Sequence, residues 1–338
     1  MMRLGAAGTR EVAGRVPRPR TSFVGRESEL GAAHRLLDCT RLLTLTGPGG
    51  SGKTRLCIAL AARVEAEFRD GVQFVPLAAV RDPSLVPASI AQSIGLQDAR
   101  GQSLLEHMTS YLADREVLLI LDNFEHVLPA GEFVAELLGA SSDLRILVTS
   151  RSPLHVSGEQ EFPVPPLHLP EPASPVSPAS LAECESAQLF GARAAASVPG
   201  FTVTGENAEA IAGIVQRLDG LPLAIELAAA RLKLLPPEAI LARLTDSLGL
   251  LVSGSRDVPD RQRTLRATIA WSHDLLSEPA RRLLAACSVF RGGIGLDHIE
   301  VVCARGLHLG VPVLDGLQEL ADQSLLRLGS SSAAAPRY

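Results

Sequence analysis

The chain has 338 residues, of which 46% are hydrophobic and 20% charged, and its formal net charge is −5. This length favours two or three domains, and the composition is that of a globular chain, not a disordered one. The net charge excludes a strong overall attraction to nucleic acids or acidic membranes, and no apolar run approaches the roughly 20 residues of a membrane helix.

The cysteines and the amino-terminal segment favour a cytoplasmic location. The five cysteines are an odd number and form no C-x-x-C pair, which argues against structural zinc and a disulfide framework. Residues 1–20 carry five arginines and one acid, without the apolar core of a secretion signal. We therefore expect a flexible basic tail over residues 1–20 and an ordered chain from about Phe23.

Short apolar strands alternate with helices over the first half of the chain. The spacing of apolar residues predicts strands at 41–46, 72–77, 117–122 and 144–150, and helices at 53–67, 84–94, 102–113 and 132–138. Continuous apolar strands that alternate with helices are typical of a parallel sheet covered on both faces. The sequence therefore predicts an α/β domain over residues 21–165.

The second half of the chain is predicted to be helical. The stretch 162–178 holds seven prolines, which predicts an extended connector, bounded here as residues 166–180, and not a helix. A helical domain follows over residues 181–255, with helices at 181–196, 206–218, 221–235 and 237–245. A third domain, 256–338, fits a winged helix, with helices at 263–275, 278–287, 296–304 and 312–321 and a strand at 324–328.

The stretch LTLTGPGGSGKTRL, residues 43–56, fits two phosphate-binding patterns at once. Residues 47–54 match both G-x-G-x-x-G, the dinucleotide pattern, and G-x-x-x-x-G-K-[ST], the P-loop pattern. A dinucleotide site also needs an acid after the second strand to hold the ribose. Residues 78–80, which follow that strand, are Ala, Ala and Val. The P-loop interpretation is therefore preferred.

Each part of a P-loop has a physical role. Its glycines let backbone N–H groups face the phosphates, at the positive end of the following helix. Lys53 would reach the β- and γ-phosphates, and the hydroxyl of Thr54 would bind Mg²⁺. We assign nucleotide binding to Gly47, Gly49, Gly50, Ser51, Gly52, Lys53, Thr54 and Arg55.

The stretch LLILDNFEH, residues 118–126, supplies the acid that a P-loop protein uses to hold Mg²⁺ through water. Asp122 stands at the end of the apolar strand, where that acid is expected. Many P-loop ATPases have a second acid at the next position, but here it is Asn123, which cannot act as a base. Glu125 either substitutes for this acid or caps the following helix. We therefore expect slow or absent ATP hydrolysis.

A third strand ends in a basic residue. In LRILVTSR, residues 144–151, Arg151 follows the strand and would sit at the carboxyl edge of the sheet, where ligands of this fold lie. A cation there could sense the γ-phosphate of a nucleotide. The alternative is an ordinary surface arginine.

Six motifs occur in a specific order along the chain. They are FVGRE (23–27), GPGGSGKT (47–54), LLILDNFEH (118–126), ILVTSR (146–151), LDGLPLAIELAAARL (218–232) and RTLRATIAWSHDLLSEPARRLLAACSVFRGG (263–293). Together they resemble a STAND-class P-loop NTPase with an NB-ARC-type core, as in the predicted-ATPase portion of bacterial SARP- and LuxR-type transcriptional regulators. The resemblance covers about residues 18–338. It implies a helical lid and a winged-helix domain after the nucleotide-binding domain.

The resemblance also implies roles for single residues. The F-V-G-R segment, here Val24, Gly25 and Arg26, would lie over the adenine and ribose, and Pro222 of the Gly-Leu-Pro turn would pack on the base. Arg151 matches the sensor position. ATP or ADP with Mg²⁺ are the implied cofactors. The candidate catalytic residues are Lys53, Asp122, Arg151 and Glu125.

Proteins of this class resemble switches. ADP holds the nucleotide domain, lid and winged helix in a closed form, and exchange for ATP releases the form that oligomerises. The resemblance thus implies a nucleotide partner and a homo-oligomer in the ATP state, with no membrane partner. Neither an effector domain before residue 20 nor a helical-repeat sensor is expected here, so DNA would be reached only through a missing or separate effector.

Two other functions stay open on the sequence. A small-molecule kinase would need arginines in the lid and an acceptor pocket, and Arg231 and Arg243 leave that open. A DNA-binding protein would act through the winged helix, but arginines there only slightly outnumber acids, a weaker footprint than a DNA site usually has. The arginines on that side are Arg261, Arg263, Arg266, Arg281 and Arg282.

Overall fold

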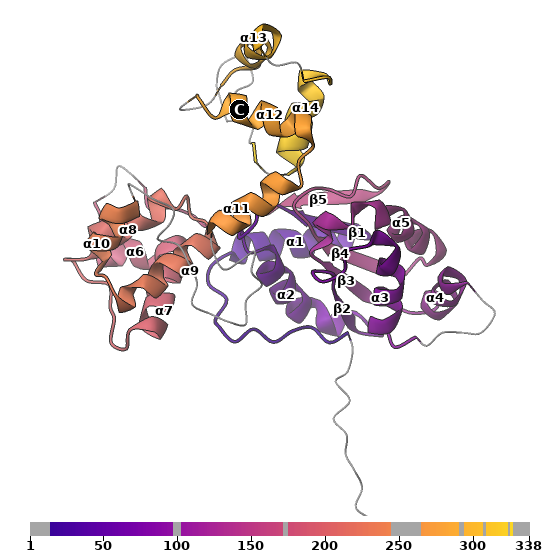
Figure 1. Cartoon of the computed structure of the whole chain (residues 1–338). Helices are drawn as coiled ribbons and strands as arrows, with labels where there is room; N and C mark the ends of the chain where they lie inside the picture. The colour runs from indigo at the N-terminus through magenta and orange to yellow at the C-terminus, as the bar shows by residue number, and fades with distance from the viewer. Residues whose placement is uncertain are drawn as a thin grey trace, which may run out of the picture.

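A computed structural model describes residues 14–96, 103–171, 175–244, 265–290, 294–306, 309–323 and 325–326 of the chain. Within these residues, an α/β body is followed by two groups of helices (Figure 1). Helix α11, the first helix of the second group, contacts the body. No helix in these described ranges combines the length and apolarity needed to cross a membrane.

The body is built on five parallel strands, and the predicted sheet is confirmed. The strands are β1 (Leu42–Thr46), β2 (Val72–Pro76), β3 (Leu118–Asp122), β4 (Arg145–Thr149) and β5 (Glu159–Pro163). Their order is β2-β3-β4-β1-β5, and all neighbours are parallel. Because β4 lies between β1 and β3, the loops that follow these three strands meet at one edge of the sheet.

Helices cover both faces of the sheet, as predicted (Figure 1). Helices α1 (Glu27–Cys39) and α2 (Lys53–Val64) pack on one face, against alternate strand residues such as Leu43 and Ile120. The other face carries α3 (Val86–Ser93), α4 (Leu104–Leu112) and α5 (Gly131–Ala140), which pack against residues such as Leu121. Burial on both sides explains why β1, LLTLT, and β3, LLILD, are mostly apolar.

Two elements of the body were not predicted. Strand β5 reads EQEFP, which lacks an apolar run, and it is held at the sheet edge by backbone pairing with β1 alone. Helix α1 buries Leu30, Ala33 and Leu37 at helical spacing. The ordered chain also begins earlier than Phe23, because Phe74 N donates to the carbonyl of Gly14 over 2.7 Å. Residues 1–13 lie outside the described ranges.

The first helical group has its own apolar core. It contains α6 (Pro178–Ala182), α7 (Glu185–Ser197), α8 (Ala208–Arg217), α9 (Pro222–Ala230) and α10 (Pro237–Leu244), and Phe190 and Ile211 are fully buried in it. The prediction of one helix over 181–196 is wrong, because Cys184 is extended and separates two helices. The predicted connector also ends earlier, since Ser177 caps α6 by accepting from Ser180 N.

The second helical group contains α11 (Leu265–Asp274), α12 (Glu278–Cys287), α13 (Leu296–Gly306) and α14 (Val313–Asp322). A small core that includes Leu283, Leu317 and Leu320 holds α12 to α14 together. Most of the predicted strand 324–328 lies outside the described residues. Leu325 and Leu326, which are described, form no strand, so the winged helix stays a prediction.

A turn between α8 and α9 packs closely against the segment that follows β5. Asp219 and Gly220 both have positive φ, 50° and 65°, and the Gly220 carbonyl accepts from Leu167 N over 3.0 Å. A Cβ atom at position 220 would lie 2.2 Å from the carbonyl oxygen of Leu167. Only glycine fits this crossing without a shift of backbone.

The substitution Gly220→Ala should therefore lower the free energy of unfolding by about 2–4 kcal/mol, because it combines backbone strain with a backbone clash. The matched control is Gly139→Ala, on an exposed site of α5 where the new methyl group meets no atom within 4 Å. The control should be stabilising by about 0.5–1 kcal/mol. Thermal unfolding of both variants measures the difference, and equal stability of the two would contradict this account of the turn.

Candidate functional site

The loop between β1 and α2 curls around the side chain of Lys53. Gly47, Gly50 and Gly52 have φ values of 143°, 83° and 93°, which only glycine adopts easily. Lys53 Nζ donates to the carbonyl oxygens of Gly47 over 2.7 Å and Pro48 over 3.1 Å. The loop thus holds an ammonium group at the N-terminus of α2, where two sources of positive potential combine.

Lys53 is a buried cation. Only 8% of it is exposed, and burial lowers its pKa to about 8, with Glu125 and Asp122 opposing the shift and Arg151 adding to it. A buried ammonium is costly unless it is paired, and the direct partners here are neutral carbonyls. The loop is therefore electrostatically suited to receive an anion.

Asp122 lies beside the loop at the end of β3. Its Oδ1 accepts from Thr54 Oγ1 over 2.7 Å and from Thr149 Oγ1 over 2.6 Å. Burial raises the pKa of Asp122, and the hydrogen bonds from Thr149 and Thr54 oppose that shift. Thr54 and Asp122, the predicted Mg²⁺ ligands, are thus in contact. The contact of Thr149 with Asp122 was not predicted. It could have been, because Thr149 is the last residue of β4 and therefore lies at the same edge of the sheet.

Glu125 faces the same space from the 3₁₀ turn Phe124–His126. Its carboxylate Oε1 lies 3.5 Å from Arg151 Nε and 3.5 Å from Asn123 Nδ2. The other oxygen, Oε2, is buried and has no hydrogen-bond partner among the described residues. No side chain caps this turn or α5, so the alternative prediction of Glu125 as a helix cap is wrong.

Arg151 connects this acid to the second helical group. Only 3% of the residue is exposed, so the alternative of a surface arginine is wrong. Its Nη1 donates to the hydroxyl of Ser272 in α11. Close by, Gln323 Nε2 donates to Ser152 Oγ over 3.4 Å, and His155 pairs with Asp322. The loop after β4 is thus where the second helical group contacts the body.

These residues line a cavity of about 430 Å³ above the loop. It contains Lys53, Thr54, Asp122, Glu125 and Arg151 from the body, together with Pro222, Leu223 and Glu226 from α9. Helix α9 touches the loop directly, because Leu223 N donates to the carbonyl of Gly50 over 3.2 Å. The sequence-predicted catalytic residues are therefore brought together in one cavity.

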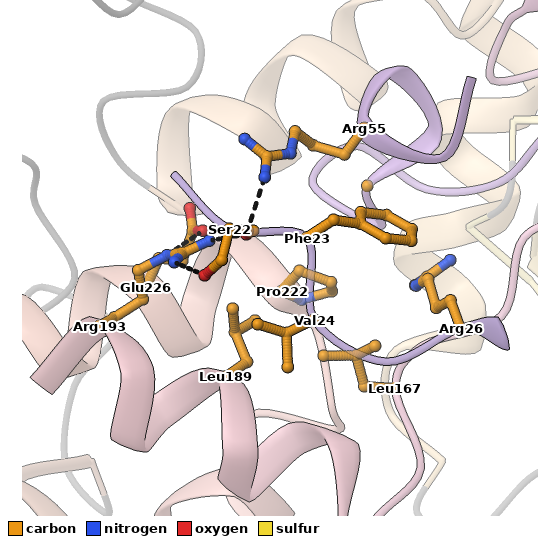
Figure 2. Close-up of a pocket in the computed structure, with 11 residues that line it drawn as sticks. Ser22, Phe23, Val24, Arg26, Arg55, Leu167, Leu189, Arg193, Pro222 and Glu226 are labelled. Atoms are coloured by element: carbon orange, nitrogen blue, oxygen red, sulfur yellow. Dashed lines mark hydrogen bonds and ion pairs between the residues drawn. The ribbon is translucent and has the colours of Figure 1, made fainter. Parts of the chain in front are cut away.

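A second, smaller pocket of about 40 Å³ lies next to this cavity. Figure 2 shows Val24, Leu167, Leu189 and Pro222 around it. Four residues line both spaces, namely Gly52, Arg55, Pro222 and Glu226. Val24 and Pro222 were predicted to lie together, and they do. Leu167, Leu189, Arg193 and Glu226 were missed, since they come together only when α7, α9 and the segment after β5 pack in the folded chain.

Arg26 connects the loop, the segment after β5 and α7. Its Nη2 donates to the carbonyls of Ser51 and Pro165, each over 2.7 Å, and its backbone N donates to Glu185 Oε1 over 2.5 Å. Burial lowers the pKa of Arg26, and Glu29 and Glu185 oppose that shift. Gly25 precedes it with a φ of 68°. Arg26 also lines the smaller pocket.

The remaining predicted arginines do not form one group. Arg55 lines both cavities, but its guanidinium donates to the carbonyls of Thr21 and Ser22 over 2.8 Å, in the segment before α1. Arg231 and Arg243 line neither cavity.

Two of the arginines considered for DNA donate within their own helical group. Arg281 donates to the carbonyls of His273 and Asp274, and Arg282 pairs with Glu278. Arg261, Arg263 and the side chain of Arg266 lie outside the described residues.

Residues 38–162 match the family of AAA domains. Putative HTH-type transcriptional regulator Rv0890c of Mycobacterium tuberculosis is 41% identical over 292 residues, which cover 86% of this chain and 31% of that protein. Regulatory protein AfsR of Streptomyces griseus is 29% identical over 317 residues, 87% of this chain and 28% of that protein. The chain thus spans about a third of the length of the curated regulators that it matches.

A shorter relative is similar over most of its own length. Uncharacterized protein Rv0894 of Mycobacterium tuberculosis is 38% identical over 308 residues, 90% of this chain and 75% of that protein. Among solved structures, the Walker-type ATPase PABY2304 of Pyrococcus abyssi aligns with 95% of both chains at a TM-score of 0.57 and 15% identity. The predicted P-loop NTPase fold and the similarity to regulators are confirmed. The NB-ARC-type core stays a prediction.

The burial of Lys53 predicts its titration in the nucleotide-free protein. The chain contains only two lysines, Lys53 and Lys233, so ¹³Cε-lysine labelling gives two resonances in an NMR spectrum. One of them should titrate with a midpoint at about pH 8 and should disappear in Lys53→Arg. Lys233, exposed in the turn after α9, provides the reference signal in the same sample. A Lys53 midpoint near about 10.4, the pKa of an unperturbed lysine, would contradict the buried position of its ammonium group.

Proposed function

The chain belongs to the same family as the uncharacterized protein Rv0894 and matches an AAA domain over residues 38–162, and on this premise we propose that it is an ATP/ADP-binding switch of a regulatory, transcription-related protein. In this proposal, residues 21–165 form the nucleotide-binding domain, residues 181–255 the lid, and residues 256–338 the winged-helix domain. Hydrolysis is slow or absent.

The observation that carries the proposal is the cavity where Lys53 and the Thr54–Asp122 pair meet. A buried ammonium with carbonyl partners suits phosphate oxygens, and the loop glycines leave backbone close to that space. The oxygens of Thr54 and Asp122 are the hard ligands that Mg²⁺ prefers, the latter through water. When bound, Mg²⁺ supplies positive charge next to the phosphate oxygens.

The smaller pocket supports adenine as the base. Its lining includes the apolar side chains of Val24, Leu167, Leu189 and Pro222 beside polar ones, and these apolar side chains suit a flat aromatic ring. The proline ring is held in place at the first turn of α9, where its missing N–H costs nothing. We assign Val24, Gly25, Arg26 and Pro222 to the base and ribose side of the site.

The polar side chains beside Asp122 support slow hydrolysis. Asn123 carries an amide where an acid would orient water, and its backbone has a φ of 65°, a conformation that asparagine tolerates. Glu125 is the nearest candidate base, and Arg151 lies 3.5 Å from its carboxylate. Because no acid at position 123 orients the attacking water, we expect hydrolysis to be slow, so that the site holds ATP for a long time before it is hydrolysed.

Contacts between the body and the helices support a switch. Helix α9 is bonded to the loop through Leu223 and Gly50, and α11 is bonded to Arg151 through Ser272. A ligand moves such an equilibrium only by its different affinity for the two states. We propose that ADP favours these contacts and that ATP, through Arg151, weakens them and permits homo-oligomerisation.

We propose that a separate effector, and not the residues described above, carries the output of the switch. Arg281 and Arg282 are engaged within their own group, so we assign DNA contact to a separate effector, as the sequence led us to expect. Neither observed cavity contains the lid arginines Arg231 and Arg243 that a small-molecule kinase would use. A cytoplasmic location stays a prediction from the sequence.

Nucleotide binding is tested by calorimetry with ADP and ATP in the presence of Mg²⁺. Lys53→Ala should weaken ADP binding about 100-fold, because it removes charge-assisted bonds to phosphate. The control Lys233→Ala removes the other lysine, which lies outside both cavities, and should leave affinity unchanged. Nucleotide released from the denatured wild-type protein should be ADP. No release and no calorimetric binding would refute the proposal.

Hydrolysis is tested by phosphate release from ATP. The wild type should turn over slowly, and Glu125→Gln should lower that turnover about 100-fold, the usual effect of removing a general base. Glu132→Gln, an exposed acid in the first turn of α5, is the matched control and should have no effect. If Glu125→Gln binds ATP and turns it over at the wild-type rate, Glu125 is not the base.

A further inference from the structure

Glu226 lies where the two cavities meet. Its side chain lines both the 430 Å³ cavity above the loop and the 40 Å³ apolar pocket. It stands one helical turn after Pro222, so the two residues share one face of α9. About 40% of the Glu226 side chain is exposed. In Figure 2 its carboxylate lies beside Arg193 at the edge of the pocket.

The inference rests on the proposed function, in which the base occupies the small pocket and the phosphates lie at Lys53. The ribose of a nucleotide connects its base to its phosphates, so it must cross the junction of the two cavities. Four residues line that junction: Gly52, Arg55, Pro222 and Glu226. The sugar would therefore meet one of these four.

Glu226 is the acceptor among these four residues. Gly52 has no side chain, Pro222 has an apolar one, and Arg55 is a donor whose guanidinium bonds Thr21 and Ser22. A carboxylate offers about four lone-pair positions. Ribose hydroxyls are donors, and an acidic side chain is what holds them in dinucleotide-binding folds. That acid is absent after β2 in this chain, where residues 78–80 are Ala, Ala and Val.

Arg193 balances the negative charge of Glu226, which would otherwise repel the phosphates. A carboxylate close to phosphates would repel them unless its charge were balanced. Arg193 Nε donates to Glu226 Oε1 over 2.8 Å, and its side chain is only 13% exposed. The same guanidinium donates to the carbonyl of Ser22 over 3.1 Å. Arg193 thus fixes the carboxylate in place and leaves lone pairs that can accept from hydroxyl groups.

We propose that Glu226 accepts hydrogen bonds from the ribose hydroxyls of the bound nucleotide. The ligand class is then a ribonucleotide with a free 2′,3′-diol, and the site discriminates against nucleotides that lack one of these hydroxyls. Glu226 acts as a specificity-determining residue and Arg193 as its positioning residue.

The test compares calorimetric affinities for ADP, 2′-deoxy-ADP and 3′-deoxy-ADP. Wild-type protein should bind at least one of the deoxy analogues about tenfold more weakly than ADP, because a hydrogen bond to a charged group is lost. Glu226→Ala should bind all three with the same affinity, and Glu226→Gln, which keeps one acceptor oxygen, should retain part of the preference. Glu209→Gln removes an exposed acid of α8 and should discriminate like the wild type.

The outcomes separate this inference from the proposed function. If the wild type binds ADP and both analogues equally, Glu226 is not a ribose acceptor, although the nucleotide site stands. A full preference retained by Glu226→Ala leads to the same conclusion. If none of the three nucleotides binds, the proposed function and this inference both fail. The wild-type comparison needs no substitution, so the result does not depend on how well a variant folds.

Discussion

The site depends on one constraint, which is the position of β4 between β1 and β3. This order places Thr149 and Arg151 between the phosphate loop and the end of β3. Thr149 fills the gap by donating to Asp122, and Arg151 extends beyond it to Glu125. If β1 and β3 were direct neighbours, neither side chain would have a place there. The chemistry of the cavity is therefore set by strand order as much as by the loop motif.

The same edge of the sheet concentrates buried charge. Lys53, Asp122, Glu125 and Arg151 are each less than a tenth exposed, although charged residues are rarely buried unless paired. Their partners include one another, two threonine hydroxyls, the hydroxyl of Ser272 and loop carbonyls. Such a cluster contributes little to stability by itself. Its presence in a fold whose buried residues are mostly apolar is typical of a binding site.

The sequence predicted those parts of the fold that have a local pattern. Short contiguous stretches of sequence are enough to predict the strands β1, β3 and β4 from their apolar runs. The same stretches predict Lys53, Thr54 and Asp122 from the spacing of their motifs. Strand β5 could not be found in this way, because its register comes from backbone pairing with β1 and not from its side chains. Likewise, Arg193 and Glu226 lie on separate helices and become a pair only when α7 packs against α9. The extended residue at Cys184, which divides α6 from α7, has no proline or glycine to signal it.

Arg151 has one guanidinium group and contacts two parts of the molecule, Glu125 in the body and Ser272 in α11. A ligand that takes the hydrogen bond that Arg151 Nη1 donates to Ser272 therefore competes with this contact to α11. Thermodynamic linkage makes this competition reciprocal. If the ligand weakens the binding of the second helical group to the body by some factor, then binding of that group to the body weakens the affinity for the ligand by the same factor. One coupling free energy links ligand binding to the docking of α11, and Arg151 is the residue that takes part in both.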